Sequence, residues 1–206
     1  MPSVLSVQHF TRAWRTLVLT TLLGTVLALA LSFLQPLQYS STVRLLITQT
    51  NTAAVDPYSA LKFTERIAGS LSELLYSSTF ANNILNSAKD LDQTYFPLDE
   101  YSKRKLWQKT VETTVSPGTG ILMVSAYHPR RDQAKVIVES ASRELALQAP
   151  NYFGNNVRVQ IIDAPLASRW YSRPNIPKNG LLGFGIGLCI GLAWLLTGNR
   201  RLSSGS

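Results

Sequence analysis

The chain has 206 residues, 45% of them hydrophobic, and a formal net charge of +8. Its single cysteine, Cys189, excludes an intrachain disulfide and a cysteine-based metal site. A basic chain invites a nucleic-acid function, but half of the excess charge comes from four arginines near the two ends. The other charges are mixed in sign and scattered, as on an ordinary solvated surface. We therefore expect no nucleic-acid partner.

Two uncharged apolar segments lie near the ends of the chain, at residues 17–34 and 181–197. As helices they would rise about 27 Å and about 25 Å, which is close to the hydrocarbon thickness of a bilayer. We predict that both span a membrane, with buried core helices as the alternative. The predicted organisation is an N-terminal segment (1–16), a first span (17–34), one domain outside the cytoplasm (35–180), a second span (181–197) and a tail (198–206).

Four arginines flank the predicted spans on the sides of the chain termini: Arg12, Arg15, Arg200 and Arg201. Basic residues close to a span favour the cytoplasmic side, so we expect both termini in the cytoplasm. Arg169, Arg173 and Lys178 precede the second span on its other side and weaken this bias, which leaves a reversed topology open.

A cleaved signal peptide is a further alternative, because Ala28-Leu29-Ala30 has the small-x-small pattern of a cleavage site. The apolar run continues to Leu34 after this site, and the preceding basic region is long. We therefore expect an uncleaved anchor.

The first half of the intervening domain begins with an alternating pattern. Val43, Leu45 and Ile47 alternate with other residues, as in a strand, and apolar residues at helical spacing follow. The predicted elements are a strand (39–49), a turn (50–57), a helix (59–76), a short helix that begins at 77–78, and a polar connection (86–97).

The second half contains a hairpin signal, in which Pro117, Gly118 and Gly120 separate two alternating runs. The predicted elements are a helix (99–109), two strands (111–115 and 121–127) around a turn (116–120), a helix (131–148) and a last strand through Val157, Val159 and Ile161. This order predicts an α+β domain with a small four-stranded mixed or antiparallel sheet covered by helices. We expect the first and last strands to pair, which would place Leu45 near Val159.

No set of nucleophile, base and orienting residue emerges from the domain, and we predict that the protein is not an enzyme and holds no cofactor or metal. His128 lies at a turn, and Asp90 and Asp92 lie in an unsupported connection, so structural roles are favoured. The glycines at 116–120 lack the Gly-Lys-Ser/Thr tail of a phosphate-binding loop.

Small residues recur every four positions in both predicted spans. The second span carries Gly183, Gly187 and Gly191, and the first carries Gly24, Ala28 and Ser32. Such a face permits close approach of helices, so we predict that the spans pack, within one protomer or between protomers.

Prolines interrupt the return to the second span, at Pro165, Pro174 and Pro177. Because proline fixes φ and lacks an amide donor, residues 163–180 should be extended and stiff. Whether this segment is more than a tether stays open at this point.

Several features, in this order, resemble the polysaccharide co-polymerases, the chain-length determinant family of bacterial inner membranes. The features are Pro36 and the strand after the first span, Asp56-Pro57-Tyr58, Leu75-Tyr76-Ser77-Ser78, Tyr127-His128-Pro129, the run from Val159 to Pro165, Pro174 and Pro177, and the glycine-rich second span. The chain is similar to the short, two-span form without a fused kinase.

The resemblance implies a homo-oligomer in the inner membrane, with its main domain periplasmic or extracellular. It would regulate the length of O-antigen, capsule or exopolysaccharide chains together with a separate polymerase or the growing polymer, and Pro165, Pro174 and Pro177 would correspond to the family's proline motif. One alternative is that residues 198–206 activate a separate cytoplasmic tyrosine autokinase in polysaccharide export. A two-span sensor that binds a small ligand is a third reading.

Overall fold

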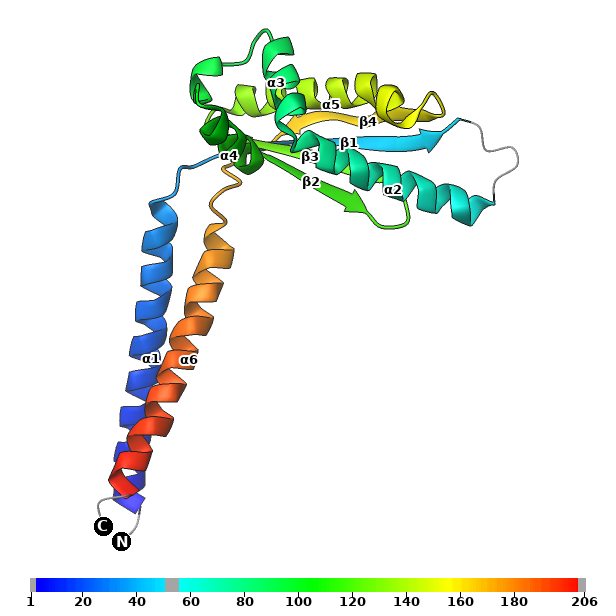
Figure 1. The fold of residues 1–206 in the computed structure, drawn as a ribbon. Helices are drawn as coiled ribbons and strands as arrows, with labels where there is room; N and C mark the ends of the chain where they lie inside the picture. The colour runs from blue at the N-terminus through cyan, green and yellow to red at the C-terminus, as the bar shows by residue number, and fades with distance from the viewer. Residues whose placement is uncertain (1–2, 51–55, 204–206) are drawn as a thin grey trace. The chain divides into compact units, whose positions relative to one another are not determined.

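The computed structural model describes the backbone of residues 3–50 and 56–203, and side chains at 14–50 and 56–196. The described elements follow one another as α1 (Ser3–Phe33), β1 (Tyr39–Gln49), α2 (Pro57–Leu75), α3 (Ser78–Ser87), η1 (Gln93–Tyr95), α4 (Glu100–Thr110), β2 (Val111–Ser116), β3 (Ile121–His128), α5 (Arg131–Phe153), β4 (Val157–Ala167) and α6 (Ile176–Ser203). They form two compact units, residues 1–36 with 174–206 and residues 37–173 (Figure 1).

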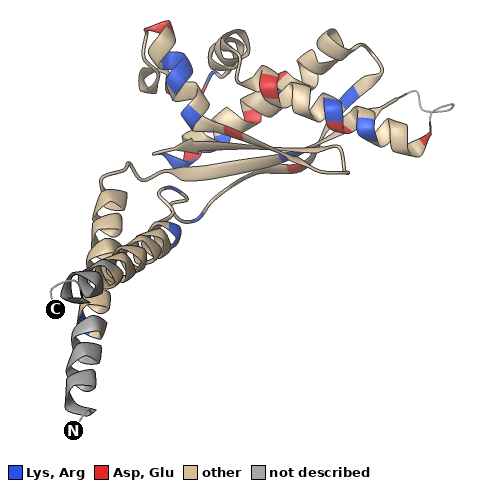
Figure 2. Cartoon of the chain, turned by 60° about the horizontal axis from the view of Figure 1, so that its bottom comes forward, with Lys and Arg blue, Asp and Glu red and all other residues tan. Residues whose placement is uncertain are grey.

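The first unit consists of α1 and α6, which lie side by side (Figure 1). Each contains a stretch long and apolar enough to cross a membrane, Trp14–Phe33 in α1 and Ile176–Leu196 in α6. Only 6% and 17% of these stretches are buried, which is unlike the core helix of a soluble protein. Figure 2 shows that the described parts of both helices are nearly free of charged residues.

The helix α6 begins at Ile176, five residues before the start of the predicted span. The side chain of Asn175 accepts a hydrogen bond from the amide of Lys178 at 3.3 Å, as a helix N-cap does. Pro177 then falls in the first turn, where its missing amide donor leaves no helical bond unmade. A local capping signal thus starts the helix before the apolar run begins.

The second unit is an α+β domain whose four strands are antiparallel throughout, in the order β2-β3-β1-β4. This confirms the predicted fold class. The bounds of β1 are those predicted, and its neighbour β4 is the last strand, as expected: Leu45 is opposite Ile161, and Ile47 is opposite Val159.

The core lies between one face of the sheet and the helices. Alternate residues of β1 and β3 are fully buried, among them Val43 opposite Val124 and Leu45 opposite Leu122. Both α2 and α5 pack on the sheet and on each other, so they cover the same face (Figure 1). Trp107 of α4 is also fully buried and donates from Nε1 to the carbonyl oxygen of Leu75 at 2.8 Å, which satisfies a group at the end of α2.

Within the domain, α5 and β4 extend furthest beyond the predicted bounds. The helix α5 continues to Phe153 through Pro150, because a proline near the helix end removes only one amide donor. The strand β4 continues to Ala167 through Pro165, since β4 is an edge strand whose pairing with β1 shifts register twice between Thr42 and Leu45. Prolines are tolerated at such edges and bulges.

Candidate functional sites

The first candidate site is the contact between α1 and α6, which is made by the small-residue faces of the two helices. Gly183, Gly187 and Gly191 are buried, and all three face α1. A Cβ atom added to Gly187 would lie 2.5 Å from the carbonyl oxygen of Thr20 and 2.8 Å from Cα of Thr21. The two backbones are therefore in direct contact at this point.

The same close approach continues along the helix pair. Gly183 faces Gly24 and Ala28, and a Cβ added to Gly24 would lie 2.7 Å from the carbonyl oxygen of Gly183. Near the end of α1 and the start of α6, Asn179 donates from Nδ2 to Oγ of Ser32 at 2.9 Å. The side chain of Ser32 is buried, with 1% of the residue exposed. The geometry thus brings together all six residues named from the four-residue spacing.

Two contacts of the helix pair were missed by sequence reasoning. Gly191 faces Thr20 and Leu17, and Asn179 bonds Ser32, so Thr20 and Asn179 extend the two faces by one turn each. The four-residue period itself contained the signal, because Thr20 precedes Gly24 and Asn179 precedes Gly183 at the same interval.

Of the arginines assigned to topology, Arg12 and Arg15 lie in the first half of α1, and Arg200 and Arg201 lie near the end of α6. Arg15 is exposed on α1. The side chains of Arg12, Arg200 and Arg201 lie outside the described part of the chain.

The second candidate site is the return segment, which leads from β4 to α6. Pro165 lies in β4, and the carbonyl oxygen of Pro174 accepts a hydrogen bond from the amide of Ile176 at 3.0 Å. The backbone of Arg173 pairs with Gln38, at 2.9 Å from the amide of Gln38 to the carbonyl oxygen of Arg173. The outgoing chain is therefore hydrogen bonded to the incoming chain just before it leaves the domain.

Arg173 also fixes this segment through its side chain. The guanidinium donates to Oε2 of Glu112 at 2.6 Å and to the carbonyl oxygen of Lys109 at 2.9 Å, and its Cζ lies 3.4 Å from the centre of the Tyr127 ring. Burial raises the pKa of Tyr127, so the phenol stays neutral under the cation. Arg173 joins the return segment to α4, β2 and β3, and sequence reasoning had noted only its charge.

The polar groups considered for chemistry have structural surroundings. His128 is 3% exposed, its Nδ1 accepts from the amide of Arg130 at 3.0 Å, and its ring lies 4.2 Å from the ring of Tyr95. Because Nδ1 accepts, the proton of the neutral ring is assigned to Nε2, which has no hydrogen-bond partner among the described residues. Burial lowers the pKa of His128 below its ordinary value, so the ring is neutral near pH 7.

The connection before α4 is held by side-chain hydrogen bonds. Asp92 accepts from the amide of Thr94 at 3.1 Å, as the cap of η1, and its own amide donates to Oε1 of Gln133 at 2.8 Å. Nε2 of Gln133 donates to the carbonyl oxygen of Asp90 at 3.1 Å. In the part of the chain that is described, no three His, Cys, Asp or Glu side chains cluster as metal ligands.

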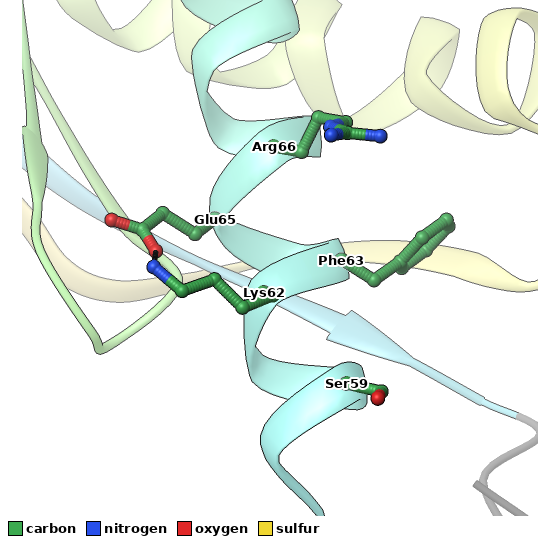
Figure 3. Close-up of a pocket in the computed structure, with 5 residues that line it drawn as sticks. All are labelled: Ser59, Lys62, Phe63, Glu65 and Arg66. Carbon is green, nitrogen blue, oxygen red and sulfur yellow. Dashed lines mark hydrogen bonds and ion pairs between the residues drawn. The ribbon is translucent and has the colours of Figure 1, made fainter. Parts of the chain in front are cut away.

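A surface hollow of about 530 Å³ borders α2 and is lined by Ser59, Lys62, Phe63, Glu65 and Arg66. Figure 3 shows that Phe63, Arg66 and Ser59 point to one side of the helix, whereas Lys62 and Glu65 pair with each other on the opposite side. A binding site requires polar groups that converge on one point. These side chains diverge, so we assign no ligand to this hollow.

Residues 7–95 match the family model of Wzz, described as chain length determinant protein, which covers a little under half of the chain. The matched part includes the apolar stretch of α1, β1, α2 and α3. No curated protein matches the chain. The resemblance to the chain-length determinants is thus confirmed over residues 7–95, and it supports a role in determining chain length in polysaccharide synthesis.

Proposed function

We propose that the protein is a non-enzymatic regulator of polysaccharide chain length in the bacterial inner membrane. The single observation that carries this proposal is the match of residues 7–95 to the chain length determinant family. The two apolar helices are consistent with a membrane protein. Both termini lie in the cytoplasm in this proposal, and the domain of residues 37–173 lies on the outer side, in the periplasm or outside the cell.

The protein acts as a homo-oligomeric scaffold beside a separate polymerase, which catalyses glycosyl transfer on O-antigen, capsule or exopolysaccharide. The small-residue face of α6 packs against α1 of the same chain. Contacts between copies must therefore use other surfaces. One is the side of the helix pair, where Trp14, Leu22, Phe184 and Leu192 border an apolar groove of about 580 Å³.

Deletion of the gene and complementation with the wild-type chain tests the function. We expect the deletion to change the distribution of glycan lengths on a gel and the plasmid copy to restore it, with total glycan synthesis retained. An unchanged distribution would refute the proposal. Normal glycan lengths combined with lost autophosphorylation of a neighbouring kinase would instead favour the kinase activator.

Oligomerisation is tested separately, by measuring the mass of the protein in detergent or in native nanodiscs. We expect several copies in each particle. A monomer under conditions in which the protein restores glycan length would refute the scaffold while leaving the regulatory role intact.

A further inference from the structure

The chain between β4 and Arg173 forms a short loop that two serines pin to the start of β1. Ser168 donates from its amide to the carbonyl oxygen of Ser40 at 2.7 Å and accepts from the amide of Ser40 at Oγ at 3.0 Å. Ser172 donates from its amide to the carbonyl oxygen of Gln38 at 2.7 Å, and its hydroxyl lies 2.7 Å from that of Ser40. Residues 168–172, here called the Trp170 loop, are therefore held at both ends.

The pinned loop presents an aromatic residue to solvent. Trp170 is 82% exposed, and the neighbouring Arg169 is exposed as well. Tyr171 stacks on Tyr39 with 4.5 Å between ring centres and supports the loop from one side. Leu166, at the end of β4, is 80% exposed and adds a second apolar side chain. Because the loop is fixed by these contacts, the apolar surface of Trp170 stays exposed to water, which is unfavourable for a soluble domain.

Only short segments of the chain separate this loop from the two candidate spans. Trp170 precedes the first residue of α6, Ile176, by six residues, and Tyr39 follows the last residue of α1, Phe33, by six residues. Six residues reach at most about 20 Å. The hydrocarbon core of a bilayer is about 30 Å thick, and the headgroup regions on both sides widen it to about 40–45 Å. Each headgroup region is therefore only about 5–8 Å deep, and six residues allow the Trp170 loop to reach it.

The chemistry of the loop matches that interface. The indole ring is apolar with one polar N–H, and tryptophan is enriched where hydrocarbon meets water. Arg169 can pair with lipid phosphate, and no acidic residue follows Asp163 in the sequence. A cation beside an exposed tryptophan, with no acidic residue among residues 164–206, suits a phospholipid surface.

We propose that the Trp170 loop inserts into the headgroup region of the bilayer. Trp170 enters the interface, and Arg169 binds phosphate. The loop thereby gives residues 37–173 a third attachment to the membrane besides the two helices. This inference rests on the proposed membrane location of the protein.

The test uses tryptophan fluorescence of the full chain in vesicles of phosphatidylethanolamine and phosphatidylglycerol, with or without lipids brominated on the upper acyl chain. Trp107 is fully buried and stays in every variant as background. The variant W14F/W194F reports Trp170, and the variant W14F/W170F reports Trp194 in α6. The variant W14F/W170F/W194F gives the background alone.

A matched control places an exposed tryptophan at the other end of the same domain. The start of α5 lies near the loop, because Arg131 donates to the carbonyl oxygen of Ala167. Leu147 is 65% exposed and lies sixteen residues further along the same helix. Sixteen helical residues span about 24 Å. The L147W substitution in the triple variant should give a signal that aqueous iodide quenches and brominated lipid does not.

We expect brominated lipid to quench the Trp170 signal and iodide to reach it poorly. If iodide quenches Trp170 as strongly as L147W while brominated lipid quenches Trp194, the loop proposal is wrong and the membrane location stands. If neither Trp170 nor Trp194 responds to brominated lipid, the membrane location fails as well. Protection of Trp170 in native membranes but not in pure lipid would identify a protein partner and overturn the lipid assignment.

Discussion

The close packing of α1 and α6 predicts opposite effects for the same substitution at two glycines of α6. A methyl group at Gly187 would meet backbone atoms of Thr20 and Thr21 at 2.5 and 2.8 Å, and backbone cannot move aside as a flexible side chain can. Ordinary contact begins near 3.4 Å, so the helices must separate by roughly 1 Å, which forfeits a quarter to a half of the attraction in each contact. We expect G187A to destabilise the helix pair by about 1–3 kcal/mol, the usual range for overpacking.

Gly185 is the matched control, because it lies two residues away and a Cβ there meets no atom within 4 Å. Alanine is the better helix former, so G185A should be neutral or stabilise by up to about 1 kcal/mol. Energy transfer from Trp14 on α1 to a dye on Cys189 of α6, with Trp170 and Trp194 replaced by phenylalanine, reports the separation of the helices during a titration with SDS. Equal midpoints for G187A and G185A would refute the backbone contact.

Three further predictions concern residues 37–173. Replacing Arg173 with lysine should lower the free energy of unfolding by about 1 kcal/mol, because lysine cannot reproduce the ring contact with Tyr127 together with the paired bonds to Glu112 and to the carbonyl oxygen of Lys109. An unchanged melting temperature would contradict this. Because burial lowers the pKa of His128, the folded state binds fewer protons than the unfolded state below the ordinary value of 6.5. Stability should therefore fall as pH drops below about 6.5, and H128N should flatten this slope in thermal melts. Replacing Trp107 with phenylalanine leaves the Leu75 carbonyl without its donor and should cost about 1–3 kcal/mol in urea unfolding; a cost near zero would show that water replaces the indole.

The elements that follow simple periodicity or capping rules were predicted closely from the sequence. The bounds of β1 were correct because Val43, Leu45 and Ile47 alternate over a half-buried strand. Asp99 caps α4, with its carboxylate 2.9 Å from the amide of Ser102, and Ser77 caps α3. In each case the local signal and the tertiary environment favour the same structure.

The features that sequence reasoning missed depend on neighbours that are distant in the chain. The strand β4 passes through Pro165 because it lies at the edge of the sheet, and strand order is invisible in the pattern of β4 alone. Arg173 contacts Glu112 and Tyr127, which are 61 and 46 positions away in the sequence, so only the fold reveals its role. The spacing of small residues in the two helices indicated faces suited to close packing but left open whether these faces meet within one chain.

The chain enters residues 37–173 after α1 and leaves them before α6. The incoming and outgoing segments are hydrogen bonded to each other within each unit. In residues 37–173 the pairing of β1 with β4 continues to the bridge between Gln38 and Arg173. In the helix pair, the contact between the two segments begins with the hydrogen bond from Asn179 to Ser32. Only short stretches of the sequence, which include Pro36 and Pro174, separate these two paired regions. The start of β1 and the end of β4 are thus held together by hydrogen bonds within residues 37–173 themselves.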